Sequence, residues 1–453
     1  MHTWDKVLQS PYNSIVSAFE SLGIELKIIL TNDLVNFNIY AISKSYSEKK
    51  IIRYVQTLNP DFVVSINNGG MSKKIQGSLK CQVVKWLFDD FPHLFFHDGI
   101  SNIAQAFTPK DIVLTYSSSL AQAVITRYPY LRDRTHFIPH STDSEIFKNI
   151  PWCPEHNISF VGSCLDTGPI HRFILRYAKT SPQISQSVIE AIELVRNDHL
   201  INFEAMVKDL NLEQAISEHN WNWLEFKRII LDVISTQDRL EGIKIVKPLG
   251  LVLFGGQNWL EPLMFEKSMA DCYQFNAVIN TQEKLTQVYQ GSKISIDIPN
   301  FQNRTAISGR VIDVMRSGSL LITKYQPDSD AFKLFGESCP IPMYKDAQHL
   351  KELCTYYLEH EDERLILVKK CNELVEKGFD FQDRIIKIFD ILNIKLPQDS
   401  PLIKFEFVPV TNFINYFGIY YWFMITQKYF ILIRSKVKLR KIAKKILQSL
   451  NTT

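Results

Sequence analysis

Hydrophobic and polar positions follow two different periods between residues 12 and 140. Apolar residues recur every three or four positions over residues 14–22, and a β-branched run follows Gly23 at residues 25–30. The same alternation of helical and strand-like patterns continues along the chain. Helical patterns recur at 49–58 and 118–128, and short apolar runs at 62–66, 83–88, 111–115 and 136–138. Short buried strands that alternate with helices are typical of a parallel sheet covered on both faces. We therefore predict an α/β domain over residues 1–150.

A second alternation begins after residues 150–154, where two prolines interrupt the pattern. Apolar runs predict strands at 158–161, 251–254, 293–298 and 320–323, and a helix is expected at 309–316. Residues 165–245 hold almost no glycine and several amphipathic stretches, so we expect a helical insertion there. The predicted class is α/β, with two Rossmann-like doubly wound domains (1–150 and 151–395, helical again after 345) and a C-terminal helical tail at 396–453.

Composition narrows the class of protein. With 453 residues, 45% hydrophobic and 22% charged, the chain is globular, which excludes a disordered, collagenous or coiled-coil protein. The formal net charge is +3, but seven basic residues lie between positions 434 and 445, so the rest carries −4. A body with that charge is a poor general nucleic-acid binder, and we expect no nucleic-acid partner.

The cysteines and the first residues suggest a compartment. Seven cysteines occur and no two are separated by just two residues, so we expect reduced thiols, without a disulfide framework or a zinc motif. The first fourteen residues have neither a basic start nor an apolar run of signal-peptide length. A cytoplasmic protein is the resulting expectation.

Three stretches of the second half carry a family resemblance. Residues 251–259 (LVLFGGQNW), 285–299 (LTQVYQGSKISIDIP) and 308–323 (SGRVIDVMRSGSLLIT) resemble the C-terminal domain of B-type (GT-B) glycosyltransferases, in particular the CgeB-like group and related enzymes of surface-polysaccharide clusters. The resemblance covers about residues 245–392, with weaker similarity at 85–92, 138–143 and 158–163. It implies a nucleotide-sugar donor bound to the second domain, transfer without a metal ion, and no cofactor.

The start of the predicted helix at 309–316 is the candidate donor site. Ser308, Gly309 and Arg310 open this helix, where unpaired N–H groups and the positive end of the dipole favour a diphosphate. Arg310 adds a planar guanidinium able to bridge two phosphate oxygens. Asp313 lies one turn on and is a candidate for the ribose hydroxyls, although relatives usually carry Glu there. The alternative is an exposed Arg310–Asp313 pair of little energetic weight.

Two glycine-containing loops are weaker candidates. Gly255 and Gly256 follow a predicted strand and permit close backbone approach to the donor. Asn68, Gly69 and Gly70 hold the matching position of the first domain and are candidates for acceptor or phosphate contact. Each group is also readable as a plain turn. Full GxGxxG and GxxxxGK[ST] patterns are absent, which counts against dinucleotide oxidoreductases and P-loop NTPases.

Candidate catalytic residues come from the first domain. Asp89 and Asp90 follow a buried-looking strand, and adjacent carboxylates raise each other's pKa, which suits a general base for a sugar hydroxyl. His93 and His140 are further candidates. Helix capping or a solvated turn explains the aspartates equally well, and lone histidines are more often structural. A metal site at His93, His97 and Asp98 is a minor alternative, and we expect no metal site in this protein.

The tail combines aromatic and basic residues. An aromatic stretch at 405–433 precedes Arg434, Lys436, Lys438, Arg440, Lys441, Lys444 and Lys445. Polar interruptions make it a poor spanning helix, whereas aromatics beside a lysine-rich amphipathic helix suit an anionic membrane surface. A packed terminal helix with a solvated basic face is the alternative. We expect a peripheral position on the inner face of the membrane, which fits a lipid-linked acceptor.

Together these features predict a metal-independent glycosyltransferase that moves a sugar from a nucleotide-sugar to a saccharide or lipid-linked saccharide acceptor in surface-polysaccharide synthesis. A nucleotide-sugar 2-epimerase is the rival enzyme, because it shares the two-domain form but uses water in place of an acceptor. A catalytically silent, membrane-associated scaffold is the non-enzymatic rival.

Overall fold

A computed structural model describes residues 12–29, 47–68, 71–95, 106–149, 154–198, 200–275, 279, 281–302, 305–397 and 405–408. This part of the chain forms two compact units. The larger unit comprises the described residues of 12–26, 66–68 and 84–397, and the smaller one those of 27–65, 71–83 and 405–408. The predicted boundary at 150–154 lies inside the larger unit and stays a prediction, whereas the α/β class with parallel sheets is confirmed.

The larger unit contains a five-stranded parallel sheet. Its strands are β6 (His156–Val161), β7 (Leu251–Phe254), β8 (Ser292–Asp297), β9 (Leu320–Lys324) and β10 (Met343–Tyr344), in the order β10-β9-β8-β6-β7. All neighbouring strands run parallel. The chain builds outward from β6 to β7, then returns to the other side of β6 and continues through β8 to β10. The direction of winding therefore reverses between β6 and β8, which is where doubly wound sheets bind ligands.

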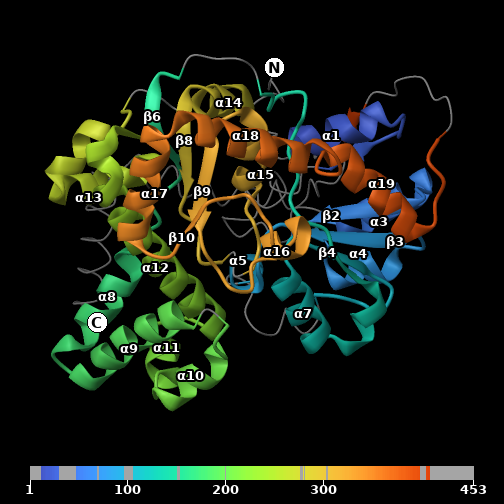
Figure 1. Ribbon diagram of the computed structural model, residues 1–453. Helices are drawn as coiled ribbons and strands as arrows, with labels where there is room; N and C mark the ends of the chain where they lie inside the picture. The colour runs from blue at the N-terminus through green and yellow to red at the C-terminus, as the bar shows by residue number, and fades with distance from the viewer. Residues whose placement is uncertain are drawn as a thin grey trace, which may run out of the picture. The chain divides into compact units, whose positions relative to one another are not determined.

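Helices cover both faces of this sheet (Figure 1). They are α12 (Trp223–Val246), α13 (Leu260–Phe265), α14 (Gln282–Gln290), α15 (Gly309–Ser317), α17 (Ala347–Glu359) and α18 (Glu361–Glu376). Leu320 and Ile322 pack in the same core as residues of α12 and α17. Leu321 between them packs against α14, α15 and α18. Successive strand residues thus enter opposite cores, as expected for a sheet buried on both sides.

A second parallel set lies in the larger unit. It consists of β3 (Gln82–Leu87), β4 (Ile112–Thr115) and β5 (Thr135–Phe137), each within one residue of the predicted bounds. Its accompanying helices are α1 (Tyr12–Ser21), α5 (Phe91–Phe95), α7 (Ser118–Arg127) and α19 (Phe381–Leu392), with the 3₁₀ turn η2 (Pro129–Arg134). Helix α16 (Asp330–Phe335) and the 3₁₀ turns η3 (Lys247–Leu249), η4 (Gln257–Trp259) and η5 (Lys267–Cys272) belong with the five-stranded sheet.

A buried carboxylate ties the two sheets together. Asp330, fully buried at the start of α16, accepts a hydrogen bond of 2.9 Å from the backbone N–H of Ser118, the first residue of α7. It also accepts from the hydroxyls of Ser118 and Thr305. A carboxylate at a helix N-terminus satisfies otherwise unpaired N–H groups, so α16 caps α7 from a distant part of the sequence.

The predicted helical insertion is confirmed between β6 and β7. Helices α8 (Gly168–Ala178), α9 (Pro182–Asn197), α10 (Phe203–Asp209) and α11 (Glu213–Glu218) form what we call the helical lobe, beside the first half of α12 (Figure 1). Phe173, Val188, Met206, Ile216 and Phe226 belong to its own buried core. The lobe is therefore anchored to the sheet chiefly through α12, which continues into the core beneath β6 and β8.

The smaller unit holds α3 (Glu48–Leu58), β2 (Phe62–Ile66), α4 (Lys73–Ser78) and a parallel pair of β1 (Lys27–Ile28) with β11 (Glu406–Phe407). Val408 is 2% exposed and packs with Ile51, Val55 and Ile75. Val408, which the sequence assigns to the tail, therefore packs in a folded core, and Glu406 and Phe407 pair with β1. The strand predicted at 25–30 is also reduced to two residues.

The seven basic residues of the predicted membrane tail lie outside the described residues. Within the described ranges, every helix falls short of the length or the hydropathy needed to cross a bilayer.

Candidate functional site

A cavity of about 250 Å³ lies where the winding of the five-stranded sheet reverses. It is lined by Ser163, Leu165, Arg239, Asp297, Pro299, Asn300, Gln302, Ser308 and Arg310. Ser163 follows β6, Asp297 is the last residue of β8, and Ser308 directly precedes α15. Of the predicted donor-binding residues, the structure brings Ser308 and Arg310 to this cavity.

The start of α15 forms one wall of the cavity. Ser308 occupies the N-cap position in an extended conformation, and Gly309 is the first helical residue. The hydroxyl of Ser308 has no hydrogen-bond partner among the described residues. The first N–H groups of a nine-residue helix and its positive dipole end therefore lie beside an unused hydroxyl, an arrangement suited to an anion.

Arg310 is held in place by a buried carboxylate. Its Nη1 donates to Asp297 Oδ1 at 3.0 Å, and Asp297 is only 2% exposed. The other carboxylate oxygen accepts from the hydroxyl of Thr323 at 2.9 Å. The guanidinium also lies 5.7 Å from the ring centre of Phe160. These contacts fix one edge of the guanidinium, while 23% of the Arg310 side chain stays exposed toward the cavity.

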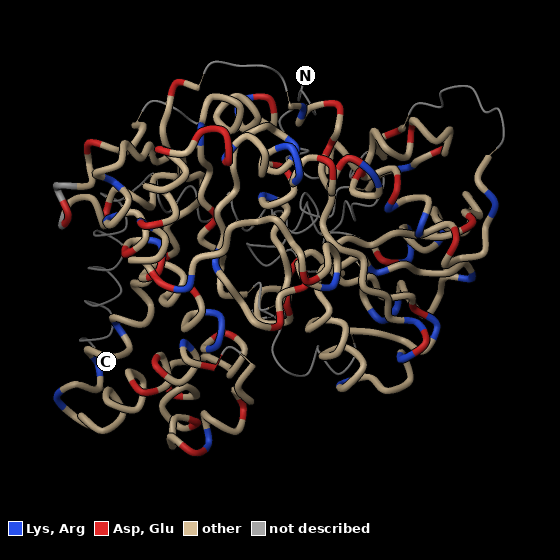
Figure 2. Tube along the Cα trace, viewed as in Figure 1, with Lys and Arg blue, Asp and Glu red and all other residues tan. Residues whose placement is uncertain are grey.

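Arg239 is a cavity residue that the sequence reasoning missed. It comes from α12, is 4% exposed, and donates to the carbonyls of Ser163 (2.6 Å) and Ile298 (3.3 Å). Burial, followed by the charge of Arg310, lowers the pKa of Arg239 to about 10. Acidic and basic residues are interspersed along the described trace (Figure 2), whereas the cavity lining holds two arginines and one carboxylate. This excess of positive charge suits a phosphate group.

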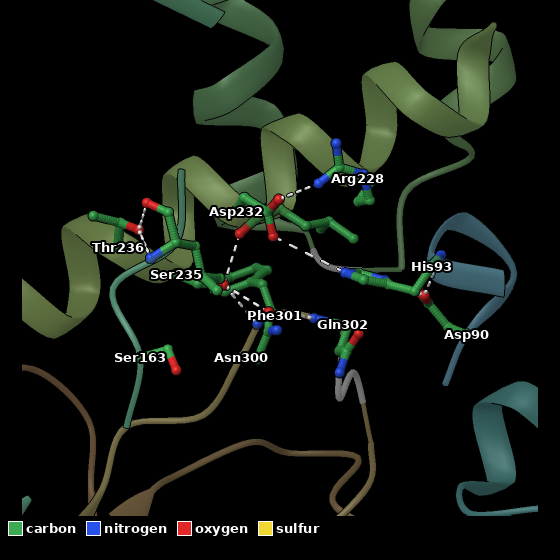
Figure 3. A network of polar contacts seen from close by, with 12 residues as sticks. Asp90, His93, Ser163, Arg228, Asp232, Ser235, Thr236, Asn300, Phe301 and Gln302 are labelled. Carbon is green, nitrogen blue, oxygen red and sulfur yellow. Dashed lines mark hydrogen bonds and ion pairs between the residues drawn. The ribbon is translucent and has the colours of Figure 1, made fainter. Parts of the chain in front are cut away.

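A polar stripe on α12 forms the side of the site next to Arg239. Asp232, Ser235, Thr236 and Arg239 recur every three or four positions and are all buried. Ser235 Oγ lies 2.9 Å from Asn300 Oδ1 and accepts from the N–H of Phe301 at 2.9 Å (Figure 3). Thr236 Oγ1 lies 3.2 Å from both the N–H and the carbonyl of Leu165. Buried polar residues at helical spacing were the sequence signal that could have identified this wall.

Asp90 and His93 form a tight pair after β3. Asp90 Oδ1 lies 2.6 Å from His93 Nδ1, and Asp90 is 7% exposed. His93 Nε2 lies 4.0 Å from Asp232 Oδ1 of α12. Burial by itself lowers the pKa of His93, but hydrogen bonds and charges of Asp232 and Asp90 outweigh it and raise the pKa to about 9. His93 is thus protonated at neutral pH, where it has no lone pair to accept a proton.

Asp89 is differently engaged from its neighbour. Its Oδ2 accepts from Asn67 Nδ2 at 2.8 Å, and Asn67 in turn accepts from the N–H of Phe88. Burial raises the pKa of Asp89, and the negative charge of Asp90 raises it further. The charge of His93 and hydrogen bonds from Asn67 and Gln302 act to lower it. Neither aspartate lines the cavity, but Gln302 does, so Asp89 is the carboxylate of the predicted pair that contacts a lining residue.

His140 lies beside the start of α15. A Cβ built on Gly309 would be 4.0 Å from the Cβ and Cγ of His140. The imidazole ring is 5.1 Å from the ring of Tyr116 and 5.7 Å from that of Phe88. Burial, together with the charge of Arg384, lowers the pKa of His140 to about 4. A neutral imidazole therefore lies next to the predicted donor helix, and its catalytic role stays a prediction.

Asp313 is not among the residues that line the cavity. It is half-buried on α15. Burial raises its pKa to about 7, partly opposed by Thr142 and Arg310. A ribose contact by this side chain stays a prediction.

Gly255 and Gly256 are also outside the lining. A Cβ on Gly255 would lie 2.3 Å from the carbonyl oxygen of Gly162 and 2.4 Å from Nε1 of Trp259. That indole N–H donates to the same carbonyl at 2.7 Å, and the hydroxyl of Tyr273 donates toward the carbonyls of both glycines. Gly255 therefore serves the packing of two strand ends, whereas a Cβ on Gly256 would meet no atom within 4 Å, and donor contact by either glycine stays a prediction.

The loop after β2 is engaged inward. Asn68 Oδ1 accepts from Lys85 Nζ at 2.7 Å, and Lys85 is fully buried beside Asp111. Gly69 and Gly70 lie outside the described residues, as do His97 and Asp98. Among the residues that the structure describes, no group of three metal-ligating side chains is present.

The predicted resemblance is confirmed for the second half of the chain: residues 239–390 match the family described as glycosyl transferase-like. This segment includes Arg239, Asp297, Ser308 and Arg310 of the cavity. A comparison with curated proteins found no match. The CgeB-like subgroup stays a prediction.

Three solved structures to which this chain is similar are distant in sequence. A glycosyltransferase from Rickettsia africae is 11% identical, with 84% of this chain and 94% of that chain covered and a TM-score of 0.43. Sucrose-phosphate synthase from Thermosynechococcus elongatus is 11% identical, with 76% and 77% covered and a TM-score of 0.46. HepE from Anabaena, solved in complex with UDP, is 11% identical, with 75% and 80% covered and a TM-score of 0.38.

Proposed function

We propose that this chain is a glycosyltransferase that moves a sugar from a nucleotide-sugar donor to a saccharide or lipid-linked saccharide acceptor in surface-polysaccharide synthesis. The observation that supports it best is the cavity at the reversal point of the five-stranded sheet, where Arg239 and Arg310 meet the start of α15. The donor diphosphate occupies this cavity. The family match over residues 239–390 supports the same reaction class.

The arginines stabilise the negative charge that develops on the leaving diphosphate during transfer. When the bond between the sugar and the diphosphate breaks, negative charge builds on the leaving phosphate oxygens. Preorganised donors aimed at that charge stabilise the transition state more than the ground state. Arg310, Arg239 and the first N–H groups of α15 supply these donors, so transfer requires no divalent metal.

The acceptor hydroxyl loses its proton to a group that lies beside the cavity. Asp89 fits this role better than Asp90, because Asp90 is hydrogen-bonded to His93 whereas Asp89 is adjacent to the cavity residue Gln302. A raised pKa makes the Asp89 carboxylate a stronger base than an ordinary aspartate. Neutral His140 is the alternative acceptor of the proton.

Membrane attachment through the basic tail completes the proposal. Seven basic residues at about 1 kcal/mol each near an anionic surface give strong, salt-sensitive attraction. Because residues 405–408 pack in the smaller unit, the informative deletion begins at residue 409. The full chain should float with anionic liposomes and the 409–453 deletion should not. Equal flotation would favour a packed terminal helix.

The reaction is tested by incubating the protein with a panel of nucleotide-sugars, with and without saccharide acceptors, in EDTA. Acceptor-dependent release of nucleoside diphosphate with a new glycoside product is expected. Acceptor-independent formation of an epimer would indicate the rival 2-epimerase, and no turnover with any donor would favour the scaffold. Activity that EDTA abolishes and manganese restores would contradict the metal-independent mechanism.

A further inference from the structure

His93 lies between two carboxylates that come from distant parts of the chain (Figure 3). Asp90, three residues earlier, contacts Nδ1 at 2.6 Å. Asp232, from the middle of α12, lies 4.0 Å from Nε2. The two imidazole nitrogens therefore face opposite carboxylates, and only a protonated ring presents an N–H to both.

Asp232 is itself fixed in direction. Its side chain is 8% exposed, and its second oxygen accepts from Arg228 Nη1 at 2.7 Å. The same stripe of α12 continues through Ser235, which contacts Asn300 and Phe301, to Arg239 in the cavity lining. One buried face of α12 thus reaches both Arg239 in the cavity lining and the loop that carries Asp89.

The charged groups around His93 come from three segments. Asp90 lies on the same turn as His93. Asp89 lies on the preceding loop, where the charge of His93 acts to lower its pKa. Asp232 and Arg228 face it from α12. The loop at residues 300–302 contributes neutral side chains only.

We propose that Asp232 is a positioning residue: it holds the His93 imidazolium against α12 and thereby fixes the loop that presents Asp89 to the acceptor. This assignment rests on the proposed function and gives the helical insertion a place in it. Asp232 acts through His93 and touches no substrate. Loss of the charge on His93 should release the loop and slow turnover, and without Asp232 the imidazole should lose that charge at a lower pH.

The proposal predicts that turnover falls at high pH, and we call this fall the basic limb of the pH profile. Burial acts to lower the pKa of His93, and the carboxylates of Asp232 and Asp90 raise it to about 9. Above that pH the imidazole is neutral, its attraction to Asp232 is lost, and turnover should fall. In Asp232→Asn one of the two carboxylates is gone, so the limb should move to lower pH by about one unit, the low end for an opposite charge at this distance.

Three variants separate positioning from general damage. Asp232→Asn should reduce kcat about fivefold at pH 9 with little change in donor KM, because a drop of about one unit in the pKa of His93 lowers its protonated fraction at that pH from about one half to about one tenth. Asp232→Glu keeps the charge and should restore most of the rate. Asp238→Asn is the matched control, because Asp238 is a carboxylate of similar burial on the same helix that pairs with Lys324 and Arg196. Its limb should coincide with that of the wild type.

The deciding experiment is NMR titration of His93 in full-length protein carrying labelled histidine, with the signal assigned by His93→Gln. It requires no substrate, so its result stands even if the wild type proves inactive, which would sink the proposed function alone. A pKa near 9 that falls by about one unit in Asp232→Asn supports the coupling. An unchanged pKa overturns it, and a shifted pKa with an unmoved basic limb of kcat overturns the positioning role.

Discussion

Two predicted donor-contact regions of the five-stranded sheet differ in the structure. The ends of β6 and β8 open into a cavity lined by Arg239, Asp297 and Arg310. The end of β7, marked by Gly255 and Gly256, is filled by aromatic side chains. Both places carry residues that are predicted to contact the donor: Ser308 and Arg310 at the first, and Gly255 and Gly256 at the second. The first keeps buried charge beside an open space, and the second uses the absence of a side chain to bring backbones together.

This difference has a topological cause. Adjacent strands β6 and β8 are followed by connections that leave in opposite directions, so a crevice stays open between them. β7 is the outer strand on its side, and Trp259 and Tyr273 close over its end. A glycine pair after a strand is therefore ambiguous by itself, whereas its place in the strand order decides its role.

The largest effect should come from removing the carboxylate that holds Arg310. In Asp297→Ala the guanidinium loses its buried partner, and the free energy of unfolding should fall by about 3 to 5 kcal/mol, as for other broken buried ion pairs. Urea denaturation measures it. Asp271→Ala is the control, since Asp271 is 84% exposed in its pair with Lys247 and should change stability by less than about 0.5 kcal/mol. Equal effects would mean that the cavity charge is not buried.

The glycine pair provides a matched test of the other strand end. Gly255→Ala places a methyl group against backbone and indole atoms, so we expect a loss of about 1 to 3 kcal/mol in unfolding free energy. Gly256→Ala meets no atom within 4 Å and has an ordinary φ of −72°, so it should be neutral within about 0.5 kcal/mol. A costly Gly256→Ala, or a harmless Gly255→Ala, would contradict the packing role.

Asp313 should produce the smallest effect, visible as a pH dependence of stability. Burial raises the pKa of Asp313 from its ordinary value of 3.8 to about 7. Between these values the folded state binds a proton that the unfolded state has released, so this residue makes stability fall as pH rises from about 4 to about 7. Asp313→Asn should reduce that slope and be more stable than the wild type above pH 7. Parallel melting-temperature curves for both proteins between pH 4.5 and 8 would refute the raised pKa of Asp313.

The sequence located the strands, the helical insertion and Arg310, because short-range periodicity and one helix start carry that information. It did not locate Arg239, since the contact between α12 and the end of β6 joins residues far apart in the chain. It also left Asp89 and Asp90 equivalent, because only the fold brings Asp90 against His93 and Asp89 near Gln302. Long-range packing decided these points.

Calorimetry with a panel of nucleoside diphosphates tests the central claim most directly, that the donor phosphates bind where β6 and β8 diverge. Arg310→Ala should weaken binding of the best nucleotide by about 1.5 to 3 kcal/mol, the range for a charged hydrogen bond. Arg316→Ala, on the last turn of the same helix and paired with Asn372, should leave affinity within about 0.5 kcal/mol of the wild type. Unchanged affinity in Arg310→Ala would place the nucleotide elsewhere and contradict the account.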